Sequence, residues 1–148
     1  MVKYCYLLPH KAPEVFEKVK QYLPDNLRTL EAFLYLYNLQ TSAFFEVGDF
    51  EGVFWLSDLI PGDRANAHIV LWGENVRKQH ARARQVLKEL FQLYSLQRLQ
   101  AFIPVINEAA CSLADSLGFT LEGVLRKFDR YDGVRVDIAV YALLKEEL

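Results

Sequence analysis

The stretch that decides the fold is INEAACSLADSLGFTLEGVLRKFDRYDGVRVDIAVYALLKEEL, residues 106–148. It begins with Asn107, a residue type that caps helices, and its apolar residues then recur at helical spacing as far as Gly118, which is typical of a helix end. Two runs rich in aliphatic and aromatic residues follow, near 119–128 and 134–143, and Asp132-Gly133 lies between them. Because Asp-Gly favours a tight two-residue turn, the stretch predicts a helix followed by an antiparallel β-hairpin.

The rest of the chain switches between a period of two residues and a helical period. Strands are predicted near 1–8, 43–47, 52–56, 67–72 and 98–105, and helices near 13–23, 27–39 and 79–94. The element order is therefore βααβββαβαββ. It predicts the α/β (α+β) class with a central mixed sheet of six or seven strands and helices on both faces. The sheet is expected to be antiparallel where hairpins connect it and parallel across the helix at 79–94.

Composition limits the class of protein. The 148 residues are 52% hydrophobic and 14% aromatic, which suits one globular core, so we expect a single domain over residues 1–148. The apolar stretches are shorter than the ~18 residues of a membrane helix, and the run before Pro9 is short for a signal peptide. We therefore expect a cytoplasmic protein without membrane contact. The two Cys and three His residues lack metal-ligand spacing, so no metal is expected.

The net charge of −2 hides a local basic cluster. It lies around the start of the helix expected at 79–94 and consists of Arg77, Lys78, His80, Arg82 and Arg84. A helix that begins just beyond the end of a strand directs free backbone N–H groups toward an anion. Because no further basic stripe accompanies it, the cluster suits a diphosphate better than a nucleic acid, which we do not expect as a partner.

The chain resembles the GNAT superfamily of acyl-CoA-dependent N-acyltransferases over its whole length and in the same element order. Residues 106–148 are most similar to the branch that contains ribosomal-protein N-terminal acetyltransferases. The matching positions are Asn107, Ala110, Leu113, Ala114, Leu117, Gly118, Phe119, Glu122, Gly123, Arg126, Tyr131, Gly133, Asp137 and Tyr141. The resemblance implies the GNAT fold and transfer of an acetyl group from acetyl-CoA, as co-substrate, to a primary amine by direct attack. The acceptor is a protein N-terminus or a small amine, and we expect a monomer or homodimer.

The acyl-CoA loop of the family, Gln/Arg-x-x-Gly-x-Gly/Ala, is degenerate in this chain, because no glycine occurs between Gly73 and Gly118. Of two possible registers, we favour the one that aligns Lys78, Ala81 and Ala83 with the motif, since it places the apolar residues at 86, 87, 90 and 91 on core positions. Asn107 either contacts the pantetheine arm or caps its helix. The implied cofactor-binding positions are Leu71, Trp72, Arg77, Lys78, Gln79, His80, Ala81, Arg82, Ala83, Asn107 and Ala110.

Three residues are candidates for proton transfer. His68 lies in the strand that corresponds to the splayed strand of the family, and a neutral imidazole suits a general base, whereas a hydrogen-bonded core histidine is the alternative. Glu122, from the Glu-Gly motif, is the competing base. Many family members carry a Tyr acid four residues before the Gly of Leu-Gly-Phe, where this chain has Ala114. Ser112 is the candidate acid in its place, and a surface serine without a catalytic role is the alternative. The missing Tyr and glycines also support a second hypothesis, a binding or assembly protein of the same fold without turnover.

Overall fold

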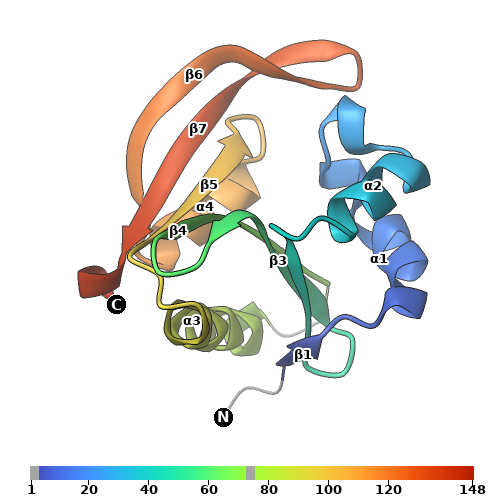
Figure 1. Cartoon of the computed structure of the whole chain (residues 1–148). Coiled ribbons are helices and arrows are strands. Elements are labelled where there is room, and N and C mark those ends of the chain that lie inside the picture. Colours follow the sequence, from blue (N-terminus) through green and yellow to red (C-terminus); the bar gives the residue numbers. More distant parts are fainter. Residues whose placement is uncertain (1–3, 73–75) are drawn as a thin grey trace.

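The computed structural model describes residues 4–72 and 76–148, apart from the side chains of residues 4, 5 and 76–79. Figure 1 shows its elements along the chain. They are β1 (Tyr4–Tyr6), η1 (Pro9–Lys11), α1 (Ala12–Val19), η2 (Lys20–Tyr22), η3 (Asp25–Leu27), α2 (Leu30–Tyr37), β2 (Ala43–Val47), β3 (Gly52–Ile60), β4 (Arg64–Leu71), α3 (Val76–Leu93), β5 (Arg98–Pro104), α4 (Glu108–Ser116), β6 (Thr120–Tyr131), β7 (Val134–Leu144) and η4 (Lys145–Glu147). The predicted order βααβββαβαββ is confirmed.

The strands form one seven-stranded sheet in the order β1-β2-β3-β4-β5-β7-β6. Only β4 and β5 pair in parallel, across α3, and every other neighbouring pair is antiparallel. Helices α1 and α2 lie on one face of the sheet and α3 and α4 on the other (Figure 1). The predicted mixed sheet with helices on both faces is therefore confirmed.

The alternation of side chains along the strands divides the core into two clusters. On β3, Val53 and Trp55 belong to the cluster under α1 and α2, whereas Phe54 and Leu56 belong to the cluster under α3 and α4. The residues of α3 at the core positions of the favoured register are all buried, namely Val86, Leu87, Leu90 and Phe91. Ala83, which that register aligns with the acyl-CoA motif, is buried in the same cluster. The sheet is thus packed on both sides by the two clusters.

Two boundaries differ from the predictions because β3 contains a bulge. Ser57 pairs with Asn66 and Ile60 with Arg64, so β3 carries one extra residue there, and Asp58 adopts a φ of +48°. As a result β3 continues four residues past the predicted end at 56 and β4 begins three residues before 67. A bulge interrupts the alternation of side chains, so the sequence pattern predicted strands that are shorter than the observed β3 and β4.

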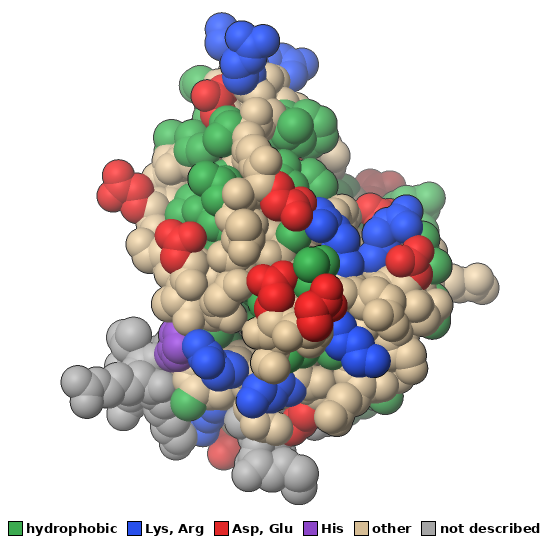
Figure 2. Space-filling model, turned by 90° about the vertical axis from the view of Figure 1, so that its left-hand side faces the viewer, with side chains coloured by type: hydrophobic (Ala, Val, Ile, Leu, Met, Phe, Trp, Pro, Cys, Tyr) green, Lys and Arg blue, Asp and Glu red, His purple; other side chains and the backbone are tan. Residues whose placement is uncertain are grey.

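The β6–β7 hairpin is confirmed, with positive φ at both turn residues, Asp132 (52°) and Gly133 (77°). Strand β6 has two further irregularities, one between Leu121 and Gly123 and one farther along, where Leu125 pairs with Ile138 but the next pair is Asp129 with Val136. Strand β6 is exposed along most of its length, and Figure 2 shows hydrophobic side chains gathered in this upper part of the molecule. Within the described ranges, no helix combines the length and the apolar character needed to cross a membrane.

Candidate functional site

Strands β4 and β5 pair over only three residues and then separate. The pairs run from Arg64 with Arg98 to Asn66 with Gln100. Beyond them, the antiparallel alternation on β4 turns the N–H and C=O of Ile69 and Leu71 away from β3, because Trp72 N donates to Glu51 O at 3.0 Å. These backbone groups therefore face the gap between the two strands.

The same alternation applies to β5. Val105 N donates to Asp137 O at 3.0 Å, which continues the antiparallel pairing of β5 with β7. Since every second residue of such a strand bonds to the partner, the N–H and C=O of Phe102 point away from β7 and toward the gap. Both edges of the gap thus offer backbone hydrogen-bonding groups that no strand pairing uses. A slender ligand with amide groups can pair with these edges in the way a strand would.

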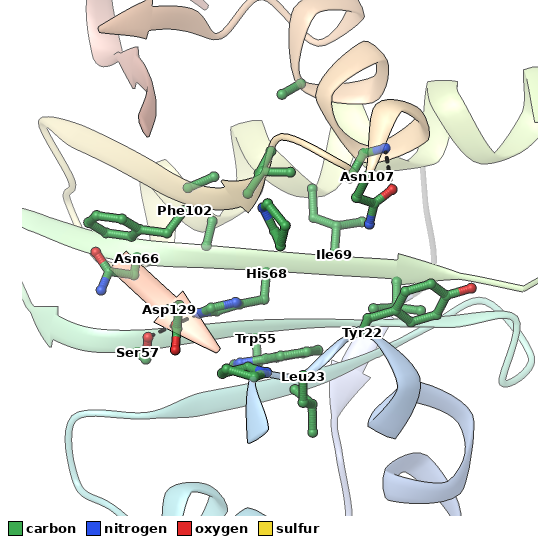
Figure 3. Close-up of a pocket in the computed structure, with 18 of the residues that line it drawn as sticks. Tyr22, Leu23, Trp55, Ser57, Asn66, His68, Ile69, Phe102, Asn107 and Asp129 are labelled. Carbon is green, nitrogen blue, oxygen red and sulfur yellow. Dashed lines mark hydrogen bonds between the residues drawn. The ribbon is translucent and has the colours of Figure 1, made fainter. Parts of the chain in front are cut away.

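A cavity of about 470 Å³ occupies the gap. Its lining includes Trp55, Ser57 and His68 from the face of α1 and α2, and Asn107 and Ala114 from the face of α3 and α4. The cavity therefore connects the two faces of the sheet through the opening between β4 and β5, and Figure 3 shows its labelled side chains around β4.

The side chain of His68 is fixed in this cavity. Its ring stacks on Trp55 with ring centroids 4.7 Å apart, and Trp55 stacks on Phe44 at 5.4 Å, because the three residues are cross-strand partners on β4, β3 and β2. Its Nε2 lies 3.2 Å from Ser57 Oγ. Burial lowers the pKa of His68 to about 4, so the imidazole is neutral at pH 7. A neutral imidazole both donates and accepts a hydrogen bond.

Two carboxylates also line the cavity, and a strand irregularity presents each of them. Asp58 lies at the bulge of β3, and Asp129 follows the irregularity of β6, where Lys127 has a φ of +49° and donates its N–H to Asp137 Oδ1 at 2.8 Å. Bulges commonly redirect a side chain toward a site. The sequence analysis did not identify either carboxylate. The only available signal was an acidic residue inside a strand pattern, and this signal does not show that the side chain faces a cavity. Together with His68 they suit a cationic or amine ligand.

A chain of polar side chains leads from Asp58 to the edge of the sheet. Asn66 donates to Asp58 at 3.0 Å and accepts from Gln100 at 2.8 Å, and Gln100 accepts from Arg98 at 3.1 Å. Arg98 in turn holds Glu122 through two bonds, of 2.6 and 3.0 Å. The hydrogen bond from Arg98 lowers the pKa of Glu122. Glu122 is not among the residues that line the cavity, so the structure does not bring this predicted base together with His68.

Some of the predicted site residues on and before α4 line the cavity, and others do not. Asn107 caps the helix, since its side chain accepts from Ala110 N at 3.1 Å, and both residues line the cavity. Figure 3 shows the side chain of Asn107 there. Ala114, at the position where the family often has Tyr, is buried against the cavity as well. Ser112 is exposed and does not line it. The structure therefore gathers His68, Asn107 and Ala110 around one cavity and leaves Ser112 and Glu122 outside it.

The end of β4 leads toward the start of α3. Leu71 packs against the cluster under α3 and α4, and Trp72 Nε1 donates to Phe50 O at 2.6 Å. The side chains of Arg77, Lys78 and Gln79 lie outside the described residues. Helix α3 begins at Val76, three residues before the prediction, and Ala81 and Ala83 lie within it, as the predicted helix at 79–94 also has them.

Three basic residues in the first half of α3, His80, Arg82 and Arg84, contact neighbouring elements. Arg82 forms an ion pair with Glu51 in the β2–β3 connection. His80 Nε2 lies 3.0 Å from Ser116 Oγ, and Arg84 donates to Ser116 O at 3.1 Å at the end of α4. Figure 2 shows Lys, Arg and His side chains beside the residues that are not described. In the part of the chain that the structure covers, no group of three His, Cys, Asp or Glu residues is arranged to hold a metal ion.

No family model and no curated protein matches the chain. Its fold matches solved structures of N-acetyltransferases. The spermidine N-acetyltransferase from Vibrio cholerae in complex with CoA and spermine has a TM-score of 0.82 at 16% identity, over 99% of this chain and 96% of that one. The ribosomal-protein-S5-alanine acetyltransferase from Vibrio fischeri has a TM-score of 0.76 at 15% identity, over 99% and 94% of the two chains. These neighbours are GNAT acetyltransferases, and the chain has their fold.

Proposed function

We propose that the protein transfers an acetyl group from acetyl-CoA to a primary amine by direct attack. The observation that carries the proposal is the cavity that passes between β4 and β5 and has a neutral His68 and two carboxylates in its lining. The neighbour solved with CoA and spermine supports this pair of ligand classes. When bound, acetyl-CoA supplies the thioester whose acyl group is transferred.

The residues around the gap fit the pantetheine arm. Ile69, Leu71 and Phe102 offer backbone groups that no strand pairing uses, and the small side chains of Ala110 and Ala114 leave space on the side of α4. For the diphosphate, we propose the start of α3, because the first four N–H groups of a helix have no partner within it. Arg77 and Lys78 are the basic residues proposed there.

The acceptor side is built to attract and orient an amine. Asp58 and Asp129 favour the entry of an ammonium group, which has to lose a proton before its nitrogen can attack. His68, with a pKa of about 4, remains neutral beside them and accepts a hydrogen bond from the amine. As the C–N bond would form, the thioester C–S bond would break and coenzyme A would leave as the free thiol. The imidazole, whose pKa of about 4 makes it a weak base at pH 7, would pass the proton that the amine nitrogen loses on to water rather than keep it. Ser57 holds the imidazole in place at 3.2 Å.

The test is release of free thiol from acetyl-CoA in the presence of a panel of primary amines. His68→Ala is expected to lower kcat/KM by about 10²-fold, the lower end of what a general base contributes. His10→Ala, at an exposed histidine outside the cavity, serves as the matched control and is expected to behave like the wild type. Absence of thiol release with every amine at millimolar acetyl-CoA would refute the proposal.

A second candidate is a binding or assembly protein that holds coenzyme A without turnover. It is favoured by the contacts of Arg82 with Glu51 and of Arg84 with Ser116, which use two of the charges that would compensate for the missing glycines. Calorimetry with acetyl-CoA separates the two candidates. Heat of binding that Lys78→Glu abolishes, without thiol release by the wild type, would support this second candidate.

A further inference from the structure

The tip of the β6–β7 hairpin is fastened to the segment between α1 and α2. Asp25 of η3 accepts hydrogen bonds from the backbone N–H groups of Asp132 and Gly133, each at 2.8 Å. Arg28 forms an ion pair with the side chain of Asp132. We call these four residues the hairpin latch. Both turn residues of the hairpin are therefore tied to a segment more than a hundred positions earlier in the chain.

The latch is itself held in position. Arg28 donates from Nε to Leu23 O at 2.6 Å and from Nη2 to Gln21 O at 3.2 Å, which fixes the guanidinium along the segment that contains η2 and η3. The guanidinium also lies 5.9 Å from the ring centroid of Tyr131, the last residue of β6. One side chain thus connects the segment before α2 with both the turn and the end of β6.

Residues on both sides of the latch line the cavity. Leu23 and Leu27 do so from the segment around η3, and Asp129 and Tyr131 from the end of β6. Figure 1 shows the hairpin extending from the sheet to this segment. The latch therefore joins two walls of the cavity on the side where the acceptor would bind, opposite the floor formed by β3, β4 and β5.

We propose that the hairpin latch restricts the acceptor to small amines and excludes the N-terminus of an extended polypeptide, with Asp25 as a specificity-determining positioning residue. The inference rests on the proposed function and deepens it by naming the acceptor class. A small amine fits between the walls. A peptide continues past its amino group and has to leave through the boundary that the latch closes, so its binding requires the latch to open.

The experiment compares wild type, Asp25→Asn and Arg28→Met, with Arg130→Ala as the matched control. Asn replaces one carboxylate oxygen with an NH₂ group, which faces a backbone N–H and cannot accept from it. Arg130 is an exposed basic residue of the same hairpin outside the latch. One measurement is amide hydrogen exchange at residues 132 and 133, and the other is the calorimetric Kd of 1,4-diaminobutane and of the tripeptide amide of alanine, each with coenzyme A present.

The wild type is expected to bind the diamine at least tenfold more tightly than the tripeptide amide. Both latch variants are expected to exchange the two amides at least tenfold faster and to reduce the affinity ratio below threefold, while the control matches the wild type. Asp25→Asn is nearly isosteric and keeps the test valid if Arg28→Met does not fold.

Unchanged exchange in Asp25→Asn would overturn the proposal, as would faster exchange with an unchanged affinity ratio, equal binding of the two amines by the wild type, or no binding of either. Turnover is measured separately by thiol release. Size-selective binding without thiol release would refute the transferase and leave the latch intact. Thiol release with no effect of the latch variants on selectivity would refute the role of the latch and leave the proposed transferase activity standing.

Discussion

The lowered pKa of the His68 imidazole makes the stability of the fold depend on pH. Burial lowers its pKa from 6.5 to about 4, so the folded protein binds a proton at this residue later than the unfolded chain does as the pH falls. The residue contributes no pH dependence well above pH 6.5, where both states are neutral. Below that value the unfolded chain is protonated first, and stability is lost progressively as the pH falls toward 4.

The two pKa values set the size of this effect. Between pH 7.5 and pH 5.0 the linkage relation gives a loss of about 2 kcal/mol in the free energy of unfolding from this one residue. The assay is urea denaturation followed by circular dichroism at both pH values, for the wild type and for His68→Gln, which cannot titrate but keeps a hydrogen-bonding group near Ser57. The wild type is expected to lose about 2 kcal/mol more than the variant.

His10→Gln is the control, because it removes an exposed histidine and is expected to keep the pH dependence of the wild type. A difference between wild type and His68→Gln below about 0.5 kcal/mol would show that the imidazole is protonated equally in both states. The reasoning on burial would then be refuted, and with it the neutral imidazole on which the proposed chemistry depends.

Three further predictions follow from the geometry. Glu122→Gln is expected to change thiol release by less than about threefold, because the carboxylate lies outside the cavity, and a loss of about 10²-fold would instead identify it as the base. Asp58→Asn and Asp129→Asn are each expected to raise KM for a diamine by about tenfold with little change in kcat, which steady-state kinetics at constant pH would measure, and equal falls in both parameters would contradict a role in attraction. Gly52→Ala is expected to lower stability by about 1–3 kcal/mol, because the new Cβ would lie 2.5 Å from Leu71 Cδ2 and 2.9 Å from a backbone oxygen, and urea denaturation with an unchanged midpoint would disprove this clash.

The sequence predicted the elements that depend on local pattern. The hairpin at Asp132-Gly133, the Asn107 cap and the buried face of α3 are all encoded within a few residues, and each is confirmed. The same holds for the order of elements, from which the parallel pairing of β4 and β5 follows.

The site was less predictable because its polar groups come from irregular strand positions. Asp58 and Asp129 reach the cavity through irregularities that break the period of two, and no local pattern marks them. The contact of Glu122 with Arg98 joins residues that are distant in the chain, so the motif suggested a base where the structure has an ion pair. The latch residue Asp25 has no sequence signal at all, since its partners are backbone N–H groups of a distant turn.

The short pairing of β4 and β5 has a mechanical consequence. Hydrogen bonds of the sheet join its two halves, β1 to β4 and β5 to β6, at only three residue pairs, and the second tie on the acceptor side is the hairpin latch at the far end of β6. The two halves and their two ties form a closed ring around the cavity. On the face of α3 and α4 the two halves are also packed together in one core cluster. Loss of the latch would therefore free the acceptor side of the cavity while the opposite side stayed packed.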